Sequence, residues 1–350
     1  MKVRLVDYLE TFKKLGYSYG PQESYRLDHI AYVVVGEKKL SYEEHGNLHT
    51  LYKNDHQKFI DYNIKDVELV ERIDEKMGLI ELVMTMAYKG GVNYTDVMGT
   101  TAIWDSIIYR DLYSRKIAPP PNEEKFKGPY PGGYVKDPHV GSHDWVVSFD
   151  LNSLYPNLIV QYNMSPETLL PAGDRDNACA AANGAPFTKK FQGMLPRIII
   201  NYSDERKAIK KDMLAAMQAN QNDPSSATER EINRLENRQM AIKILLNSLY
   251  GALGNKYFRY FNQSVAEGIT TSGQLAILTA EKAMNIEMNK ILKTDKDYVI
   301  AIDTDSLYVN FGPLVEKLKP KNIVKTLDTI CNDHFTKALN AAYDKLAVEE

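Results

Sequence analysis

The chain has 350 residues, of which 44% are hydrophobic and 25% are charged, a composition typical of a globular protein of about two or three domains. Its formal net charge of -3 excludes a globally basic nucleic-acid-binding protein, so nucleic acid would have to bind at local basic patches. The opening segment has no apolar core like that of a signal peptide, no apolar run is long enough for a membrane span, and the two cysteines have no metal-site spacing. We therefore expect a soluble, cytoplasmic protein that has no membrane partner.

The first third of the chain is expected to be mostly helical. Apolar residues recur about every 3.6 positions through residues 55–91, and residues 1–115 share this helical character. The segment 117–145 is rich in Pro and Gly and is expected to connect the helical block to a sheet. Residues 145–150 (Trp-Val-Val-Ser-Phe-Asp) predict a strand, and residues 172–187 predict a loop of small residues.

The second half predicts a helical hairpin followed by a helix and a β-hairpin. Two polar helices over 202–222 and 227–254 are separated by an Asp-Pro-Ser-Ser break. A further helix over 272–292 precedes two strands in 298–312, which meet at Asp-Thr-Asp. This order indicates an α+β fold with one helical insertion in its sheet domain.

Carboxylates stand at the ends of the predicted strands. Asp150 ends an apolar run, and Asp303 and Asp305 share one tight turn. Taken alone, Asp150 with Ser153 would be read as a capped turn, and an acidic hairpin tip as a surface turn. Together, repelling carboxylates at strand ends favour a site for Mg²⁺, which binds a few carboxylates plus substrate phosphates and supports two-metal phosphoryl transfer.

Basic residues on the predicted helices could bind a polyphosphate. Lys243, Asn247 and Tyr250 have the spacing of one helix face. Arg206 and Lys210 share a face of the preceding helix, although such a charge pair alone is usually a solvated surface. In a hairpin the two faces would form a basic cleft.

Three of these segments resemble motifs A, B and C of the family B DNA polymerases, in the family's order. They are Asp-Leu-Asn-Ser-Leu-Tyr-Pro (150–156), Lys-Ile-Leu-Leu-Asn-Ser-Leu-Tyr-Gly (243–251) and Asp-Thr-Asp-Ser (303–306). Tyr-Pro-Gly-Gly (130–133) is similar to the family's Tyr-x-Gly-Gly segment, and Tyr62 with Asp66 resembles its third exonuclease motif. The chain is most similar to the replicative polymerases of T-even-type bacteriophages, which would place it in the host cytoplasm.

The resemblance implies roles for individual residues. Asp150 and Asp305 would bind two Mg²⁺ ions, with Mn²⁺ as a substitute, supported by Asp303 as the third catalytic carboxylate and by the carbonyl of Leu151. Tyr155 would lie under the incoming sugar and exclude a 2′-hydroxyl. The implied nucleotide-binding residues are Leu151, Asn152, Ser153, Leu154, Tyr155, Arg206, Lys210, Lys243, Asn247 and Tyr250. The implied DNA-binding residues are Tyr130, Gly132 and Gly133, and the implied exonuclease remnant is Tyr62 with Asp66.

The resemblance also implies a division into domains. Residues 1–79 would be the end of the 3′-5′ exonuclease domain, 80–121 a connecting segment, 122–192 and 256–350 the palm, and 193–255 the fingers. The earlier exonuclease motifs and the thumb have no counterpart, so we expect a fragment or one part of a split polymerase. Asn157 replaces the Ser more usual in motif A, and Ile302 a frequent Gly before motif C, which bears on the fine geometry of the site.

Two functional hypotheses follow. The first is a template-directed DNA polymerase of viral or phage replication, a nucleotidyltransferase whose partners are primer–template DNA, deoxynucleoside triphosphates, and a sliding clamp or complementary polymerase fragment. The alternative is a non-catalytic DNA-binding or assembly fragment that requires a partner chain. A generic nucleotide-binding ATPase is excluded because the sequence has no Gly-x-x-x-x-Gly-Lys-Ser/Thr loop.

Overall fold

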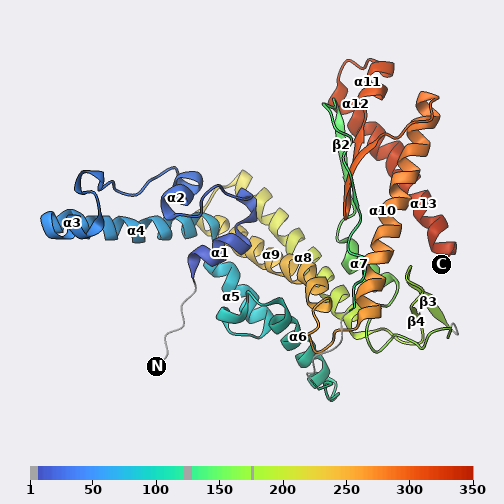
Figure 1. Ribbon diagram of the computed structural model, residues 1–350, viewed down its shortest axis with the longest axis horizontal. Coiled ribbons are helices and arrows are strands. Elements are labelled where there is room, and N and C mark those ends of the chain that lie inside the picture. Colours follow the sequence, from blue (N-terminus) through green and yellow to red (C-terminus); the bar gives the residue numbers. More distant parts are fainter. Residues whose placement is uncertain (1–6, 122–127, 175–176, 350) are drawn as a thin grey trace. The chain divides into compact units, whose positions relative to one another are not determined.

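The chain folds into two compact units, which we describe separately. The computed structural model describes residues 7–121, 128–174 and 177–349. The first unit comprises Met1–Ala118 and Asp204–Leu245, and the second comprises Pro119–Ser203 and Leu246–Glu350 (Figure 1). Helices predominate and the main sheet is antiparallel, so the predicted α+β class is confirmed.

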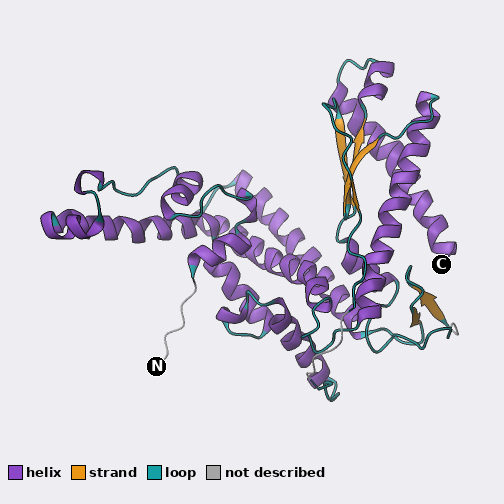
Figure 2. Ribbon diagram, in the orientation of Figure 1, coloured by secondary structure: helices purple, strands orange, loops and turns teal. Residues whose placement is uncertain are grey.

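All regular secondary structure in the described part of the first unit is helical, and loops connect the helices (Figure 2). Its α-helices are α1 (Tyr8–Leu15), α2 (Leu27–Val35), α3 (Leu48–Asn54), α4 (His56–Met77), α5 (Leu79–Gly90) and α6 (Thr100–Ser114), with short 3-10 helices at Tyr17–Tyr19, Glu43–His45 and Tyr94–Asp96. Two long helices, α8 (Met194–Asn222) and α9 (Ser226–Leu253), have residues in both units. The helical character predicted for residues 1–115 is confirmed over residues 7–115, and residues 1–6 lie outside the described residues.

Helix α4 illustrates how local sequence defines these elements. The side chain of Asp55 accepts a hydrogen bond from the backbone amide of Lys58, which caps the amino end. Gly78 ends the helix in the left-handed conformation with φ 63°, which glycine adopts without steric cost. Between these caps, Leu69 and Ile73 are buried on one face, as the helical period requires.

The second unit is built on a four-stranded antiparallel sheet in the order β1-β5-β6-β2. Its strands are β1 (Val135–Lys136), β2 (Val146–Asp150), β5 (Val299–Asp303) and β6 (Ser306–Asn310), and a separate two-stranded sheet contains β3 (Ala178–Ala180) and β4 (Pro186–Thr188). Its helices are α7 (Leu154–Gln161), α10 (Gln263–Leu292), α11 (Gly312–Leu318), α12 (Ile323–Ile330) and α13 (Thr336–Glu349), with a π-helical turn at Cys331–Phe335. Figure 1 shows α10 and α13 side by side.

The core of this unit lies between the sheet and α10. The side chain of Phe311 is fully buried, and its ring meets Phe335 edge-on at a centroid distance of 5.0 Å. It also approaches the ring of Phe149 at 6.4 Å. Met284 and Val309 belong to the same buried cluster. This packing fixes α10 against the strands that end in the predicted catalytic carboxylates.

Several predicted boundaries differ from the structure. Helix α8 begins at Met194 and not at residue 202, and α10 begins at Gln263 and not at residue 272. The extension of α8 contains the β-branched run Ile198–Ile200, and β-branched residues have a low intrinsic helix propensity. Ile198 and Ile199 are buried, and this burial outweighs the low propensity. The predicted loop 172–187 contains β3 and the start of β4, and its residues 175–176 lie outside the described residues.

The predicted helical hairpin is confirmed as α8 and α9. Three residues, 223–225, connect the two helices. Within the first unit, Nε of Arg206 in α8 donates a hydrogen bond to Oε1 of Gln239 in α9 at 3.1 Å. The two residues are separated by a similar stretch of helix from the residues that connect α8 to α9, as expected for a hairpin. The predicted connector 117–145 contains the short strand β1, and its residues 122–127 lie outside the described residues.

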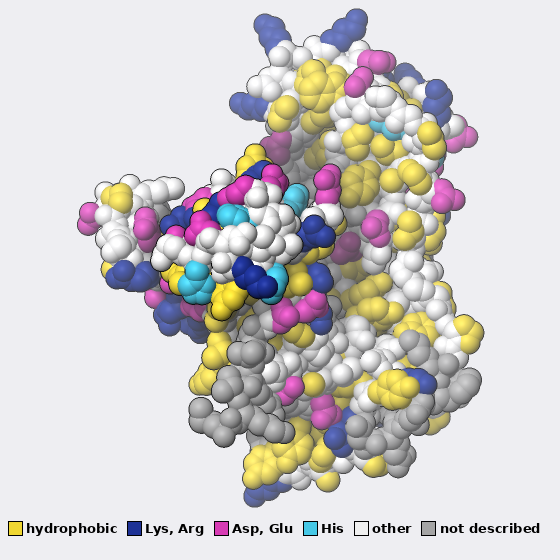
Figure 3. Space-filling model, turned by 60° about the vertical axis from the view of Figure 1, so that its left-hand side comes forward, with side chains coloured by type: hydrophobic (Ala, Val, Ile, Leu, Met, Phe, Trp, Pro, Cys, Tyr) yellow, Lys and Arg dark blue, Asp and Glu magenta, His cyan; other side chains and the backbone are white. Residues whose placement is uncertain are grey.

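On the face drawn in Figure 3, several Lys and Arg side chains stand at the top of the picture, and hydrophobic and uncharged side chains predominate below them. Lysines gather around α11 and α12, where Lys317, Lys319, Lys321 and Lys325 are exposed. Among the described residues, none of the helices combines the length and apolarity that crossing a membrane requires.

We predict that Phe311→Ala lowers the free energy of unfolding by about 3–5 kcal/mol, because it leaves a cavity at the contact of three rings. Tyr308→Ala, on the same segment but 38% exposed, is the control and should cost far less. Urea denaturation followed by circular dichroism measures both. Equal losses in the two variants would contradict this assignment of the core.

Candidate active site

The three predicted catalytic carboxylates come together at one end of the main sheet in the second unit. Asp150 is the last residue of β2 and pairs with Ser306 of β6. Asp303 is the last residue of β5 and also pairs with Ser306, from the opposite side. Asp305 lies in the turn between β5 and β6, and its carbonyl accepts a hydrogen bond from the amide of Leu151 at 2.7 Å. The strand register therefore places Asp150 and Asp303 on the two sides of this acidic turn.

The acidic turn, residues 303–305, has an unusual backbone. Thr304 has a φ of 55°, in the left-handed region that few non-glycine residues occupy. The amide of Asp305 donates to the carbonyl of Asp303 at 2.6 Å, and the amide of Thr304 donates to the carbonyl of Tyr134 at 2.8 Å. Such a conformation persists only where neighbouring structure holds it, and it is frequent at functional sites.

The carboxylates repel one another. Burial, and after it the negative charge of Asp150, raises the pKa of Asp305, and Asp303 acts in the same direction. Within the described ranges, no group of three or more His, Cys, Asp or Glu side chains is close enough to hold one metal ion. Asp150 and Asp305 are the carboxylates whose charges interact most strongly here. Hard oxygen donors of this kind, in a negative environment, fit Mg²⁺ or Mn²⁺ with the remaining positions left to water or substrate.

The turn after β2 leads directly into α7. Ser153 precedes the helix with a φ of 54°, so the chain bends sharply between Asn152 and Leu154. Asn157 donates from its side chain to the carbonyl of Asn152 at 2.9 Å. The residue that departs from the family pattern therefore stabilises this turn, a role that the sequence did not indicate.

Two tyrosines implied in nucleotide binding lie against each other in the second unit. The rings of Tyr155 and Tyr250 have centroids 4.7 Å apart with an interplanar angle of 49°. Burial and the nearby charge of Asp305 raise the pKa of Tyr155, and burial with a hydrogen bond to Tyr130 raises the pKa of Tyr250. The phenols thus remain neutral at physiological pH and can act as hydrogen-bonding and packing groups.

Two glycines lie in close contact with Tyr155, and one of them also lies close to Thr304 in the acidic turn. A Cβ atom on Gly133 would lie 2.7 Å from Oγ1 of Thr304 and 3.2 Å from the hydroxyl of Tyr155. A Cβ atom on Gly273, in α10, would lie 2.9 Å from Cε1 of Tyr155. Gly132, by contrast, faces open space. Gly273 was missed from the sequence, although a glycine within a long apolar helix signals a close contact.

Two further residues of α10 were also missed. The hydroxyl of Thr270 donates to the carbonyl of Pro131 at 2.8 Å, and the side-chain amide of Gln274 donates to the carbonyl of Gly132 at 2.7 Å. These bonds fasten the segment 130–134 to α10. The polar run Thr-Thr-Ser-Gly-Gln (270–274), placed between apolar residues, was the available signal.

The implied phosphate-binding residues are divided between the two units. Arg206, Lys210 and Lys243 belong to the first unit, and Asn247 belongs to the second. Lys210, Lys243 and Asn247 are exposed, whereas Arg206 is half-buried beside Gln239. Lys243 and Asn247 lie on the continuous helix α9, so their predicted helical spacing is confirmed.

The implied exonuclease residues have a different environment. Asp66 forms an ion pair with Lys39, with Oδ2 2.7 Å from Nζ. The same Nζ lies 4.7 Å from the ring centroid of Tyr62, which is buried on α4. Burial opposes the charge of Lys39, but the hydrogen bond that Lys39 donates to Asp66, together with the interaction with Tyr62, outweighs burial and raises the lysine's pKa. A carboxylate already neutralised by a lysine does not fit a divalent-ion site.

Comparison with known sequences agrees with the resemblance described above. The family described as DNA polymerase family B matches residues 99–347, and the chain belongs to this family. Among curated relatives, the chain is similar to the DNA-directed DNA polymerase of Enterobacteria phage T4, with 32% identity over an alignment 408 positions long that covers 98% of this chain and 45% of the relative.

Other relatives extend the comparison. The DNA-directed DNA polymerase of Escherichia phage RB69 shows 32% identity over an alignment 407 positions long, with the same coverage of 98% of this chain and 45% of the relative. A DNA polymerase of Pyrococcus glycovorans is 36% identical over 200 residues, 57% of this chain and 24% of the relative. The chain thus spans less than half of the length of the two phage polymerases.

We predict that Asp150→Asn lowers the pKa of Asp305 in the metal-free chain, because it removes the charge that most disfavours ionisation of that carboxylate. Burial remains, so the pKa should stay above its ordinary value. Asp303→Asn should have a smaller effect in the same direction. A pH titration of the carboxyl carbon signals by NMR measures this pKa, and an unchanged value in Asp150→Asn would show that the two groups do not interact.

Proposed function

We propose that this chain carries the nucleotidyl-transfer centre of a template-directed DNA polymerase that acts in phage DNA replication. The observation that supports this proposal most directly is the gathering of Asp150, Asp303 and Asp305 around the start of β6. A non-catalytic DNA-binding fragment would gain nothing from carboxylates that repel one another and DNA. The family membership and the two phage relatives support the same class of reaction.

In the proposed reaction, the 3′-hydroxyl of a primer attacks the α-phosphorus of a deoxynucleoside triphosphate. A phosphodiester bond forms, the bond to the β-phosphate breaks, and pyrophosphate leaves. Asp150, Asp305 and the carbonyl of Leu151 would hold two divalent ions, with Asp303 beside them. Bound Mg²⁺ would lower the pKa of the attacking hydroxyl and offset the charge that develops on the phosphorus.

The chain's own groups would orient the nucleotide. The sharp bend at Ser153 leaves backbone amides at the start of α7, from Asn152 to Leu154, as donors to the triphosphate. Tyr155 would support the sugar, and Tyr250 would pack beside the nascent base pair. The remaining phosphate-binding groups that we propose are Arg206, Lys210, Lys243 and Asn247.

We propose the following division of the chain. The palm would comprise residues 122–192 and 256–350, the fingers 193–255, the connecting segment 80–121, and the end of the exonuclease domain 1–79. Tyr130, Gly132 and Gly133 would contact the DNA. Because Lys39 neutralises Asp66, we assign to Tyr62 and Asp66 a structural role and no part in excision.

We predict that Asp305→Asn or Asp150→Asn abolishes primer extension in Mg²⁺, with a loss of at least about a thousandfold in rate, because each removes a charge that would hold the ions. The assay is extension of a labelled primer–template by the purified chain. Both variants should keep the far-ultraviolet circular dichroism of the wild type. Extension at a rate close to wild type by either variant would refute the proposed metal ligands, and DNA binding without extension by the wild type would favour the binding-fragment alternative.

We predict that Tyr155→Ala increases the use of ribonucleotides relative to deoxynucleotides by about tenfold or more, because it opens space beneath the sugar. Lys243→Ala is the matched control on the phosphate side. It should raise KM for both nucleotide types and leave their ratio unchanged. Single-nucleotide incorporation kinetics measure kcat/KM for each substrate. An unchanged ratio in Tyr155→Ala would exclude the tyrosine as the group that senses the 2′-position.

A further inference from the structure

Strand β1 is very short, although it supports one side of the acidic turn. It has two residues, Val135 and Lys136, and lies at the edge of the main sheet. Val135 pairs with Asp303, and the preceding residue, Tyr134, accepts the hydrogen bond from the amide of Thr304 at 2.8 Å. The outer side of the acidic turn is therefore held by an edge strand that backbone pairing alone would hold weakly.

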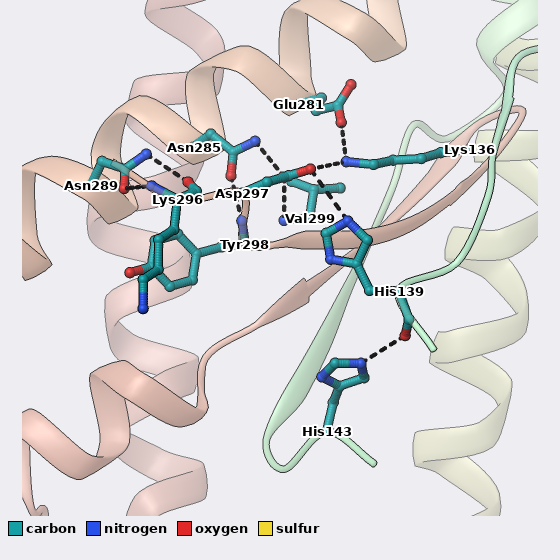
Figure 4. A network of polar contacts seen from close by, with 10 residues as sticks. All are labelled: Lys136, His139, His143, Glu281, Asn285, Asn289, Lys296, Asp297, Tyr298 and Val299. Carbon is teal, nitrogen blue, oxygen red and sulfur yellow. Dashed lines mark hydrogen bonds and ion pairs between the residues drawn. The ribbon is translucent and has the colours of Figure 1, made fainter. Parts of the chain in front are cut away.

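The side chain of Lys136 supplies a second anchor. Its Nζ lies 2.5 Å from Oε1 of Glu281 on α10 and 2.5 Å from Oδ2 of Asp297, just before β5 (Figure 4). The Lys136 and Glu281 side chains are 14% and 17% exposed, so solvent screens this pair only in part. Burial opposes the charge of Lys136, but its two carboxylate partners outweigh burial and raise its pKa. The lysine thus stays charged and joins β1 to α10 and to the start of β5.

The partners of Lys136 are themselves fixed. Asp297 accepts hydrogen bonds from the side chain of Asn285 at 2.8 Å and from the amide of Val299 at 3.1 Å. Asn285 in turn accepts from the amide of Tyr298 at 2.8 Å. Figure 4 shows these residues as one continuous network between α10 and the sheet. Through Glu281 and Asn285, the contacts of Lys136 therefore connect β1 to α10.

We infer that Lys136 is a positioning residue for the acidic turn: by fastening β1 to α10 and β5, it holds the backbone of Tyr134 and Val135 against Thr304 and Asp303. This inference deepens the proposed function, and its consequences for catalysis rest on that function. The claim that Lys136 holds β1 against the acidic turn does not depend on any activity. Without the lysine, the carboxylates of the partly buried Glu281 and the exposed Asp297 would lose the cation that joins them, and β1 would move away from the turn that it supports.

The experiment compares amide hydrogen exchange at two positions by NMR. In Lys136→Met, the amide of Thr304 should exchange about tenfold faster or more, because its acceptor, the carbonyl of Tyr134, directly precedes the released strand. The amide of Phe311, which donates to the carbonyl of Trp145 at 3.0 Å at the opposite end of the sheet, should change little. Lys136→Arg should restore most of the protection.

Lys282→Met is the matched control, because it removes the same charge from the exposed face of α10 and should leave Thr304 unaffected. Glu281→Gln tests the same anchor should Lys136→Met fail to fold, and should also speed exchange at Thr304. Wild-type exchange at Thr304 in both anchor variants, or equal acceleration at Thr304 and Phe311, would overturn the inference.

Primer extension separates this inference from the proposed function. With an active wild type, Lys136→Met should raise the Mg²⁺ concentration at half-maximal rate and lower kcat by about tenfold, with KM for the nucleotide changed little. A wild type that extends no primer would refute the proposed function, while the exchange result would still decide the role of Lys136. Loss confined to KM for the nucleotide would contradict a role in positioning the acidic turn.

Discussion

The second unit depends on holding like charges together. Asp150, Asp303 and Asp305 lie around the end of one strand, and their mutual repulsion with burial raises the pKa of Asp305. A carboxyl whose pKa is higher in the folded chain than in the unfolded chain opposes folding once the pH rises above its ordinary value, so at neutral pH the site costs stability. Neighbouring structure must compensate. The sheet register, the fully buried ring of Phe311 and the packing of α10 provide that support.

The segment 130–134 connects that support to the proposed substrate-binding tyrosines. On one side it receives the hydrogen bonds of Thr270 and Gln274 from α10, and on the other it accepts the amide of Thr304. Gly133 brings it close enough to contact Tyr155 as well. One short, irregular segment is therefore in contact with the helix, the acidic turn and the proposed sugar-binding residue. A displacement of this segment would therefore change its contacts with both the acidic turn and Tyr155.

Sequence reasoning found the elements whose pattern is local and missed those that depend on distant packing. The alternation and turn residues around Asp303 predicted the β5–β6 hairpin, and the polar helices with their Asp-Pro-Ser-Ser break predicted α8 and α9. Strand β1 was missed because two residues carry no periodicity, and they form a strand only because β5 lies beside them. The early start of α8 was missed because burial of an isoleucine run overrides its preference for strands. The importance of Gly273 and Lys136 could not be predicted from the sequence, because the residues that they contact are distant in the chain.

A motif fixes the identity of a residue but not the charges around it, and the two predicted acidic sites of this chain illustrate the difference. Asp305 has carboxylate neighbours, so its environment favours a cation that the chain does not itself supply. Asp66 has Lys39 at 2.7 Å, so the chain supplies its own cation. The lysine also contacts the ring of Tyr62, and both residues of the motif are thereby used to fasten the segment after α2 onto α4. An aspartate therefore needs an external cation in the first place and is already paired with a lysine in the second. For that reason the surroundings of each carboxylate, and not the motif alone, decide which of them we assign to catalysis.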